Sequence, residues 1–426
     1  TRMSYCNAGP PVAAYIVQKL TGQDFEAYVQ ENFFGPLGMT TATYRQSTDV
    51  LERGVTLYNG TEPQDYWHIV MRPSGSINAS PNDMARLASF FVNRGNVNGQ
   101  QLVSEASLRR MEFAATTPAS AAGQEIGYGL NNYSSRHKGW IYREHNGGVN
   151  GGLTEFSYLP EARVGHAIMI NSGSGEGYRA ISDLVRDFET RDLVPREAAA
   201  GVTPGPEHEA LAGLYQPINP RQEVGRFLEQ MFGIRVLRFD GDDLQVSPLL
   251  DDDARSYVAA SPNAYRDKDT GAISLVQVED PLAGTVVHNG TNVLQPVSGV
   301  VAYGRFVVAA LWGLSIGISI LYALVWGVRR LRGKIAPGPT IRIRVYPLLA
   351  GLSAIGFVLL FIAGMDDPFN ALGKPTAISV GIMLMTVLFA LFAALGLHSA
   401  YSVRKEPMNR VNYWFATTSS VLHGLV

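Results

Sequence analysis

The pattern of hydrophobic and polar positions divides the chain into three parts. In residues 1–195, apolar residues recur at helical spacing in several segments, and short strand-like runs lie between them. Asp24 is placed to cap a helix that should end at Gly35-Pro36, and Ser80, followed by a proline, should open another helix. This mixture of helices and strands predicts an α+β fold for the first part.

The second part has the pattern of a separate β-rich unit. Residues 196–210 are rich in proline, glycine and alanine, which is the composition of a linker. From residue 211 to 300, short β-type runs are separated by Asp-Gly and Asn-Gly turns. We therefore expect a small β-rich accessory domain, whose function the sequence does not indicate.

The third part, residues 304–426, is strongly apolar. The segments 306–328, 345–365 and 375–397 contain no charged side chain, and each is long enough to cross about 30 Å of hydrocarbon as a helix. A fourth segment, 411–426, is cut short by the end of the sequence. Arginine and lysine are concentrated after the first and third segments, so the positive-inside rule makes those connectors cytoplasmic and places the preceding domains on the outer face.

Composition narrows the classes of function. The 426 residues carry a formal net charge of −2, which gives no support to nucleic-acid binding. The one cysteine, Cys6, excludes an intramolecular disulfide and a cysteine-based zinc site, and we expect no metal and no cofactor. The first residues do not resemble a natural start, and the last apolar run is interrupted. We therefore expect this sequence to be a fragment of a longer protein.

Residues suited to chemistry occur at two places far apart in the sequence. Tyr5-Cys6-Asn7 stands at the start, and the run HNGG at 145–148 precedes a strand-like segment. Glycines at this density let a ligand approach the backbone closely. On its own the second motif is also typical of a plain turn.

The order of the motifs resembles the serine β-lactamase and penicillin-binding-protein superfamily, above all its class C and esterase-like branch. Y-x-N is followed by F-E-A-Y-V-x-x-x-x-F-x-P-L-G-M-T, then by RPSGSINASPNDMARLASFFVNRG, GYGL at 127–130 and the HNGG run, over residues 1–190. The resemblance implies a β-lactamase/transpeptidase-like fold, of which 1–195 would be the C-terminal part. It also implies acyl transfer through the serine of an S-x-x-K motif. Because the family places that motif before Y-x-N, we expect it to be missing here, and the later match Ser135–Lys138 to be an exposed polar turn.

The resemblance gives catalytic roles to Tyr5 and Gly148. Tyr5 would take the serine proton, helped by the positive charge of the absent lysine, because a tyrosine with a pKa near 10 is not a base at neutral pH by itself. The backbone N–H of Gly148 would form half of an oxyanion hole. Asn7 would hydrogen-bond the substrate or the lysine.

The resemblance also assigns substrate binding to His145, Asn146 and Gly147, where the family carries Lys-Thr-Gly or variants with histidine first. Histidine holds less positive charge than lysine at pH 7, and Asn146 replaces the usual hydroxyl residue. Both departures argue against recognition of a carboxylate and favour neutral esters or amides. Gly147 would let the strand lie against the ligand.

These observations predict a membrane-anchored serine hydrolase of a bacterial cytoplasmic membrane, with the hydrolase domain on the outer, periplasmic face. Its partners would be a small ester, amide or peptide substrate and membrane lipid, and the fragment itself should be inactive. The alternative is a non-catalytic penicillin-binding-like homologue that acts as a cell-wall or β-lactam sensor. A transporter gains little support because the spans contain no charged residue.

Overall fold

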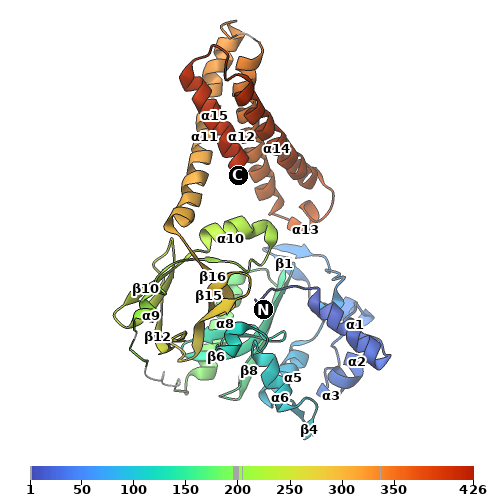
Figure 1. Ribbon diagram of the computed structural model, residues 1–426. Helices are drawn as coiled ribbons and strands as arrows, with labels where there is room; N and C mark the ends of the chain where they lie inside the picture. The colour runs from blue at the N-terminus through green and yellow to red at the C-terminus, as the bar shows by residue number, and fades with distance from the viewer. Residues whose placement is uncertain (1, 195–200, 204, 336) are drawn as a thin grey trace. The chain divides into compact units, whose positions relative to one another are not determined.

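The computed structural model describes residues 2–194, 201–203, 205–335 and 337–426 (Figure 1). The chain forms two compact units, Thr1–Ser298 and Gly299–Val426. The α+β region and the β-rich region both lie in the first unit. The predicted linker lies partly outside the described residues, so its bounds stay a prediction.

The α+β region consists of short helices around a four-stranded sheet, as the sequence predicted. Its helices are α1 (Gly9–Thr21), α2 (Phe25–Val29), η1 (Gln30–Phe34), α3 (Gly35–Leu37), α4 (Thr48–Arg53), η2 (Arg72–Ser74), α5 (Pro81–Val92), α6 (Glu105–Glu112), α7 (Pro118–Ala121) and α8 (Gly175–Thr190). Its strands are β1 (Leu57–Asn59), β2 (Glu62–Gln64), β3 (Asn96–Val97), β4 (Gln100–Gln101), β5 (Tyr133–His137), β6 (Trp140–Val149), β7 (Gly152–Leu159) and β8 (Val164–Ile170).

The helix caps follow the sequence signals, with one correction. The carboxylate of Asp24 accepts hydrogen bonds from the first turn of α2, and Ser80 forms a capping box at the start of α5. The helix that begins after Asp24 does not end at Gly35-Pro36, because the π turn η1 lets the chain pass the proline. It ends at Gly38, whose φ of 70° is the left-handed conformation that favours glycine.

Strands β5 to β8 form an antiparallel meander in the order β5-β6-β7-β8. Phe156 and Tyr158 of β7 belong to the hydrophobic core that includes Phe91 of α5. Glu155, on the opposite face of β7, bonds to Ser182 of α8. The two helices therefore cover opposite faces of the sheet, and alternate residues of each strand face one helix or the other.

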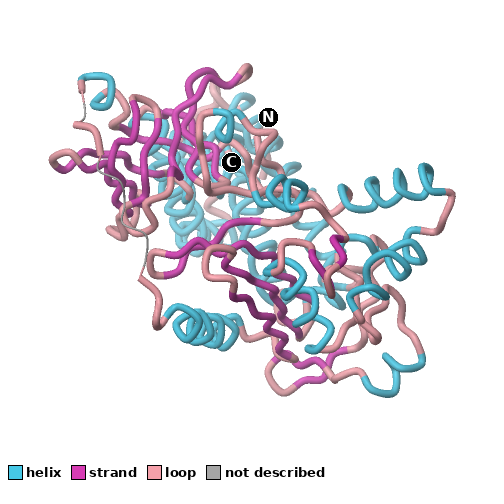
Figure 2. The backbone as a smooth tube through the Cα atoms, turned by 90° about the horizontal axis from the view of Figure 1, so that it is seen from below, coloured by secondary structure: helices cyan, strands magenta, loops and turns pink. Residues whose placement is uncertain are grey.

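The β-rich region is a closed antiparallel barrel, which confirms the predicted β-rich domain. Strand β9 (Gly213–Pro217) pairs with both β10 and β16 and thereby closes the barrel. The other strands are β10 (Arg235–Asp240), β11 (Asp243–Pro248), β12 (Arg255–Ser261), β13 (Ala264–Asp267), β14 (Ile273–Asp280), β15 (Gly284–Asn289) and β16 (Asn292–Val297). The short helices α9 (Pro206–Glu209), η3 (Glu223–Gly225) and α10 (Arg226–Phe232) lie before and after β9 in the chain. In Figure 2 the barrel and the sheet are two separate groups of strands.

Alternation along the barrel strands fills the interior with apolar side chains. Leu237, Leu244, Leu275 and Leu294 are buried in one cluster, as expected when every second residue of a strand points inward. The predicted Asp-Gly and Asn-Gly turns form at the strand ends. Gly241, for example, has a φ of 59° in the turn between β10 and β11.

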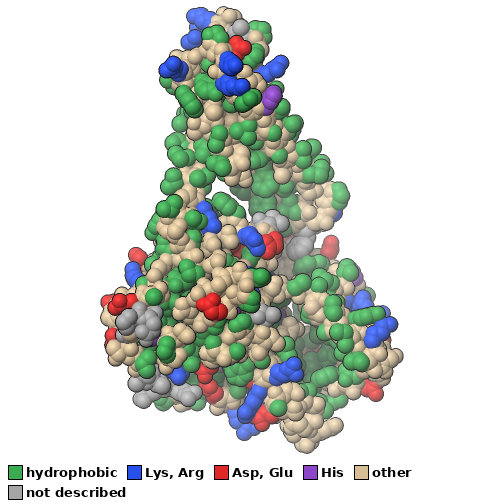
Figure 3. Space-filling view, viewed as in Figure 1, with side chains coloured by type: hydrophobic (Ala, Val, Ile, Leu, Met, Phe, Trp, Pro, Cys, Tyr) green, Lys and Arg blue, Asp and Glu red, His purple; other side chains and the backbone are tan. Residues whose placement is uncertain are grey.

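The second unit consists of long apolar helices. Three of them, α11 (Gly299–Leu331), α12 (Pro339–Gly364) and α14 (Ala377–Ser402), are long and apolar enough to cross a membrane. The short α13 (Pro368–Ala371) and the 16-residue α15 (Arg410–Leu425) complete the unit. In Figure 3 hydrophobic side chains cover the middle of this unit, and basic side chains gather at one end. The three long helices overlap the three predicted spans, which extend one residue past the end of α12 and begin two residues before the start of α14.

Candidate active site

The candidate site lies at the end of strand β6 that extends past its neighbour β5. Pairing between the two strands begins at Tyr133 opposite Glu144, so the later residues of β6 have a strand partner only in β7 within the described sheet. Gly147 and Gly148 lie in this extension and are exposed. An unpaired strand edge presents backbone groups that can bind an extended ligand or a carbonyl oxygen.

Both glycines also meet a packing requirement on the side of β7. A Cβ atom at Gly147 would lie 3.3 Å from Oγ1 of Thr154, and one at Gly148 would lie 3.2 Å from Cδ2 of Leu153. These contacts are tighter than most Cβ contacts, so the Thr154 and Leu153 side chains would have to shift by a few tenths of an ångström. Glycine therefore keeps β6 and β7 closely paired and leaves the open edge free of side chains.

His145 is held in one neutral tautomer. Its Nδ1 lies 2.7 Å from the carbonyl oxygen of Asn146, and its Nε2 lies 2.7 Å from the hydroxyl oxygen of Tyr128. A carbonyl oxygen only accepts, so Nδ1 carries the proton and Nε2 accepts the hydrogen bond from Tyr128. Burial lowers the pKa of His145, which keeps the ring neutral near pH 7.

Tyr128 connects the two distant motifs, and the sequence analysis assigned it no role. Its ring packs edge-on against Tyr5, with 5.9 Å between centroids, and stacks on Tyr133 at 5.8 Å. Burial raises the pKa of Tyr128 to about 12; the nearby Tyr5 adds to this rise and Arg221 opposes it. Tyr128 therefore stays protonated and remains the donor to His145. Tyr128 is the tyrosine of the GYGL motif at 127–130, but only the fold shows which residues it contacts.

The two residues of the Y-x-N motif have different surroundings. Tyr5 is half-buried against Tyr128, and the guanidinium carbon of Arg221 lies 5.2 Å from the Tyr5 ring centroid. Asn7 is exposed, and its backbone carbonyl accepts a hydrogen bond from the Ser74 hydroxyl. The structure thus brings Tyr5 to the His145 side of the sheet, and the role of the Asn7 side chain stays a prediction.

Asn146 lies on the other face of the sheet from His145. In the register of β6 and β7, His145 is opposite Phe156 and Asn146 is opposite Glu155. Directly opposite residues share a face, so the Asn146 side chain is on the α8 side, where it interacts with the Tyr178 hydroxyl. Its predicted contact with substrate would have to be made over the exposed strand edge.

A buried charge network supports β6 from the α8 side. The guanidinium of Arg186 bonds to Glu144 of β6 and lies 3.5 Å from Glu155 of β7. His166 of β8 contacts Glu155 at 3.1 Å and Glu189 at 3.0 Å. These five side chains join three strands to α8 beneath the site.

The network fixes the charges of its members. Burial alone would raise the pKa of Glu155, but hydrogen bonds from His166, Tyr178 and Ser182 outweigh it and lower that pKa to about 2. Burial alone would lower the pKa of His166, but its two carboxylate partners raise it to about 9. His166 is therefore a buried cation at neutral pH.

The Ser135–Lys138 match is not a nucleophile with its lysine. Ser135 lies in β5, half-buried, and its hydroxyl donates to Glu144 at 2.6 Å. The Lys138 ammonium bonds to Asp187 at 2.8 Å in the turn after β5. The expectation of an exposed turn is thus wrong for the serine, because the strand begins two residues earlier, at Tyr133.

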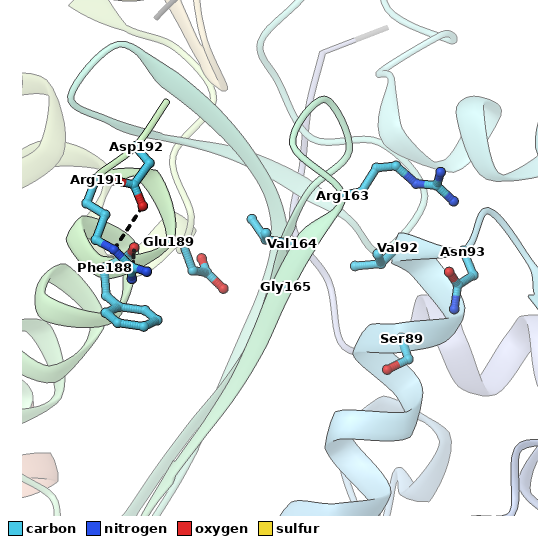
Figure 4. Close-up of a pocket in the computed structure, with 10 residues that line it drawn as sticks. All are labelled: Ser89, Val92, Asn93, Arg163, Val164, Gly165, Phe188, Glu189, Arg191 and Asp192. Carbon is cyan, nitrogen blue, oxygen red and sulfur yellow. Dashed lines mark hydrogen bonds and ion pairs between the residues drawn. The ribbon is translucent and has the colours of Figure 1, made fainter. Parts of the chain in front are cut away.

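Two surface cavities lie away from the predicted residues. Figure 4 shows a pocket of about 460 Å³ beside the edge strand β8, between the ends of α5 and α8. It is lined by Ser89, Val92, Asn93, Arg163, Val164, Gly165, Phe188, Glu189, Arg191 and Asp192. None of the predicted site residues faces it, so the candidate site is an open strand edge and not this cavity. Within the described residues, no group of three or more His, Cys, Asp or Glu side chains could hold a metal ion.

Comparison with known proteins agrees with the order of the motifs. Residues 1–189 match the family model described as Beta-lactamase. The D-alanyl-D-alanine-carboxypeptidase/endopeptidase AmpH of Escherichia coli (strain K12) is 22% identical over 205 residues, which cover 45% of this chain and 50% of AmpH. Penicillin-binding protein 4 of Amycolatopsis lactamdurans is 27% identical over 237 residues, which cover 51% of this chain and 60% of that protein.

The chain spans about half the length of the curated relatives it matches. Among solved structures, the octameric penicillin-binding protein homologue from Pyrococcus abyssi covers 69% of this chain and 65% of its own, at 16% identity and a TM-score of 0.36. A likeness of that size has no bearing on function. The family match and the series of motifs cover the same residues. Residues 1–189 are therefore similar to the beta-lactamase and transpeptidase-like family over the same stretch that carries the motifs.

Proposed function

We propose that this chain is part of a membrane-anchored serine hydrolase that cleaves ester or amide bonds through an acyl-enzyme intermediate. One observation carries the proposal. Tyr5 and His145 lie far apart in the sequence of the α+β region, and Tyr128 joins them by a ring contact to Tyr5 and a hydrogen bond to His145. This cluster adjoins the open edge of β6 that contains Gly148.

The proposed chemistry needs a proton acceptor, an oxyanion site and a serine. Tyr5 accepts the serine proton as the hydroxyl oxygen attacks the substrate carbonyl carbon. The backbone N–H of Gly148 stabilises the oxyanion, and Tyr5 then returns the proton to the leaving alcohol or amine. Water cleaves the acyl-enzyme by the same route. In this proposal the serine is that of the S-x-x-K motif, which the family places ahead of Tyr5. Activity must therefore be assayed on the full-length protein.

His145 has a positioning role in this proposal. Its Nε2 already accepts a hydrogen bond from Tyr128 and its Nδ1 donates to the backbone, so the ring has no free polar atom for the substrate. The contact orients Tyr128, and Tyr128 packs against Tyr5. His145 thus acts on the reaction through the two tyrosines. Gly147, beside it on the strand edge, borders the substrate.

The long apolar helices support membrane anchoring. In the proposal the hydrolase region lies on the outer face of a bacterial cytoplasmic membrane, in contact with lipid through these helices, because the basic connectors favour the inner side. The relative AmpH is named as a D-alanyl-D-alanine-carboxypeptidase/endopeptidase. We therefore include peptide amides of that kind among the candidate substrates, beside small esters and amides.

Covalent labelling of the full-length protein tests the proposal. A fluorophosphonate and a fluorescent penicillin should each label one serine, and Tyr5→Phe should slow the labelling by orders of magnitude. Tyr15→Phe is the matched control, because Tyr15 is an exposed tyrosine of α1 that contacts Lys19. Folded protein that neither reagent labels would refute the enzyme. Labelling by penicillin with no turnover of any ester or amide would favour the sensor.

A further inference from the structure

The barrel loop that follows β9 is hydrogen-bonded to the segment that carries Tyr5. The amide of Asn219, just after β9, donates to the carbonyl oxygens of Met3 at 3.0 Å and of Thr291 at 2.9 Å. Its side-chain oxygen accepts from the backbone N–H of Val293 at 2.8 Å. One asparagine therefore ties the barrel strands and the start of the α+β region together, two residues before Tyr5.

Further contacts hold the barrel against both motifs of the site. Arg2 forms a bidentate ion pair with Asp280 of β14, with N–O distances of 2.7 and 2.8 Å. Glu125 exchanges two hydrogen bonds with the backbone of Ile273, both 2.7 Å long. Glu125 stands three residues before Tyr128. These contacts join the barrel to the segments just before Tyr5 and Tyr128, and so fix the position of the barrel loops relative to the site.

Arg221 lies in the same loop after β9, and its side chain contacts Tyr5 of the candidate site. Its guanidinium carbon lies 5.2 Å from the Tyr5 ring centroid, and its backbone N–H donates to Glu229 at 3.3 Å. The residue is exposed, and among the described residues no carboxylate forms an ion pair with its guanidinium. A guanidinium that rests on a ring face, without an acid beside it, can bind an arriving anion.

Arg221 is also the positive charge that the cluster otherwise lacks. His145 is neutral, because burial lowers its pKa and its Nε2 accepts a hydrogen bond. Tyr128 is protonated, with its pKa raised to about 12 by burial although Arg221 opposes that rise. The sequence favoured neutral substrates because histidine stands where the family carries lysine. The fold instead brings a cation from another domain.

We propose that Arg221 is a specificity-determining residue that binds a carboxylate on the substrate beside the ester or amide bond that is cleaved. This rests on the proposed hydrolase function and names its substrate class: esters and amides that bear a carboxylate. Arginine suits this role because its planar fork of N–H donors matches the two oxygens of a carboxylate. When the substrate binds, the Arg221 guanidinium gives up part of its contact with the Tyr5 ring and contacts the substrate carboxylate.

Two peptides that differ only in charge test the proposal on the full-length protein. We compare hydrolysis of N-acetyl-D-alanyl-D-alanine and its C-terminal amide, with 4-nitrophenyl acetate as a neutral ester. Arg221→Ala should lower kcat/KM for the acid about 10- to 100-fold more than for the amide and the ester, the usual value of one charge-assisted hydrogen bond. Arg221→Lys should restore part of the loss. Arg226→Ala is the matched control, because Arg226 is an exposed arginine at the start of α10 that pairs with Glu223 of η3.

The outcomes separate this proposal from the function on which it rests. Equal loss on all three substrates would overturn it, because Arg221 would then act on Tyr5 or on the fold. If the wild type cleaves none of them, the proposed function fails, and binding of N-acetyl-D-alanine and of its amide is measured by calorimetry. A preference for the acid that disappears in Arg221→Ala would still support carboxylate binding. Equal affinity for both compounds would overturn it.

Discussion

The buried cation His166 gives a quantitative prediction about stability and pH. The pKa of His166 is raised from its ordinary value of 6.5 to about 9 in the folded protein. At about 1.4 kcal/mol for each unit, this difference corresponds to about 3 kcal/mol of stability. Because the folded-state pKa is the higher one, the contribution is present in full below pH 6.5 and is lost as the pH rises through about 9.

The perturbation is His166→Gln, which keeps a polar side chain and removes the charge. In the wild type, the free energy of unfolding of the α+β region should fall by about 3 kcal/mol more between pH 6.5 and 9.5 than it does in the variant. Below pH 9 the variant should be the less stable protein, because Glu155 and Glu189 stay buried without their shared cation.

Hydrogen exchange of β7 and β8 peptides in the full chain, measured in increasing urea, gives the required free energies. His68→Gln is the control, because His68 is an exposed loop residue. If wild type and His166→Gln lose stability equally between pH 6.5 and 9.5, His166 is not the cation of this network. At the acid end, Glu155 has its pKa lowered to about 2, so its contribution is complete above about pH 4.5 and is lost as the pH falls through about 2. The pKa shifts of His166 and Glu155 describe the same ion pair, so their contributions to stability do not add.

Three further predictions concern the site and its support. Tyr5→Phe should reduce acylation of the full-length protein by orders of magnitude, whereas His145→Ala should reduce it less, because His145 acts through Tyr128 and Tyr5; equal losses in stopped-flow assays would give His145 a larger role. Tyr128→Phe removes the hydrogen bond to His145 and should raise the pKa of that ring, which NMR titration of the histidine would detect; an unchanged pKa would contradict the assigned tautomer. Asp83→Ala removes the carboxylate half of the α5 capping box and a buried partner of Thr41, and should cost about 2 kcal/mol by urea unfolding; a loss under 0.5 kcal/mol would show that solvent replaces these bonds.

Local signals predicted most of the architecture. Helix caps such as Asp24 and Ser80, and turn glycines such as Gly241, act on neighbours within a few residues, so the sequence contains their whole mechanism. The apolar spans follow from length and composition alone. The wrong helix end at Gly35-Pro36 has a different origin, because a π turn depends on packing that no local rule contains.

The sequence by itself determined the family motifs, the β-rich region and the apolar helices. Each of these depends on residue type and spacing within one segment. Only the tertiary structure decided that Tyr128 joins Tyr5 to His145, that β5 begins too late to pair with the end of β6, and that Arg221 of the barrel reaches the site. These contacts join residues far apart in the chain, and chain folding, not local propensity, brings such residues together. For the same reason, the charge of the site could not be read from the HNGG motif, because the cation comes from another domain.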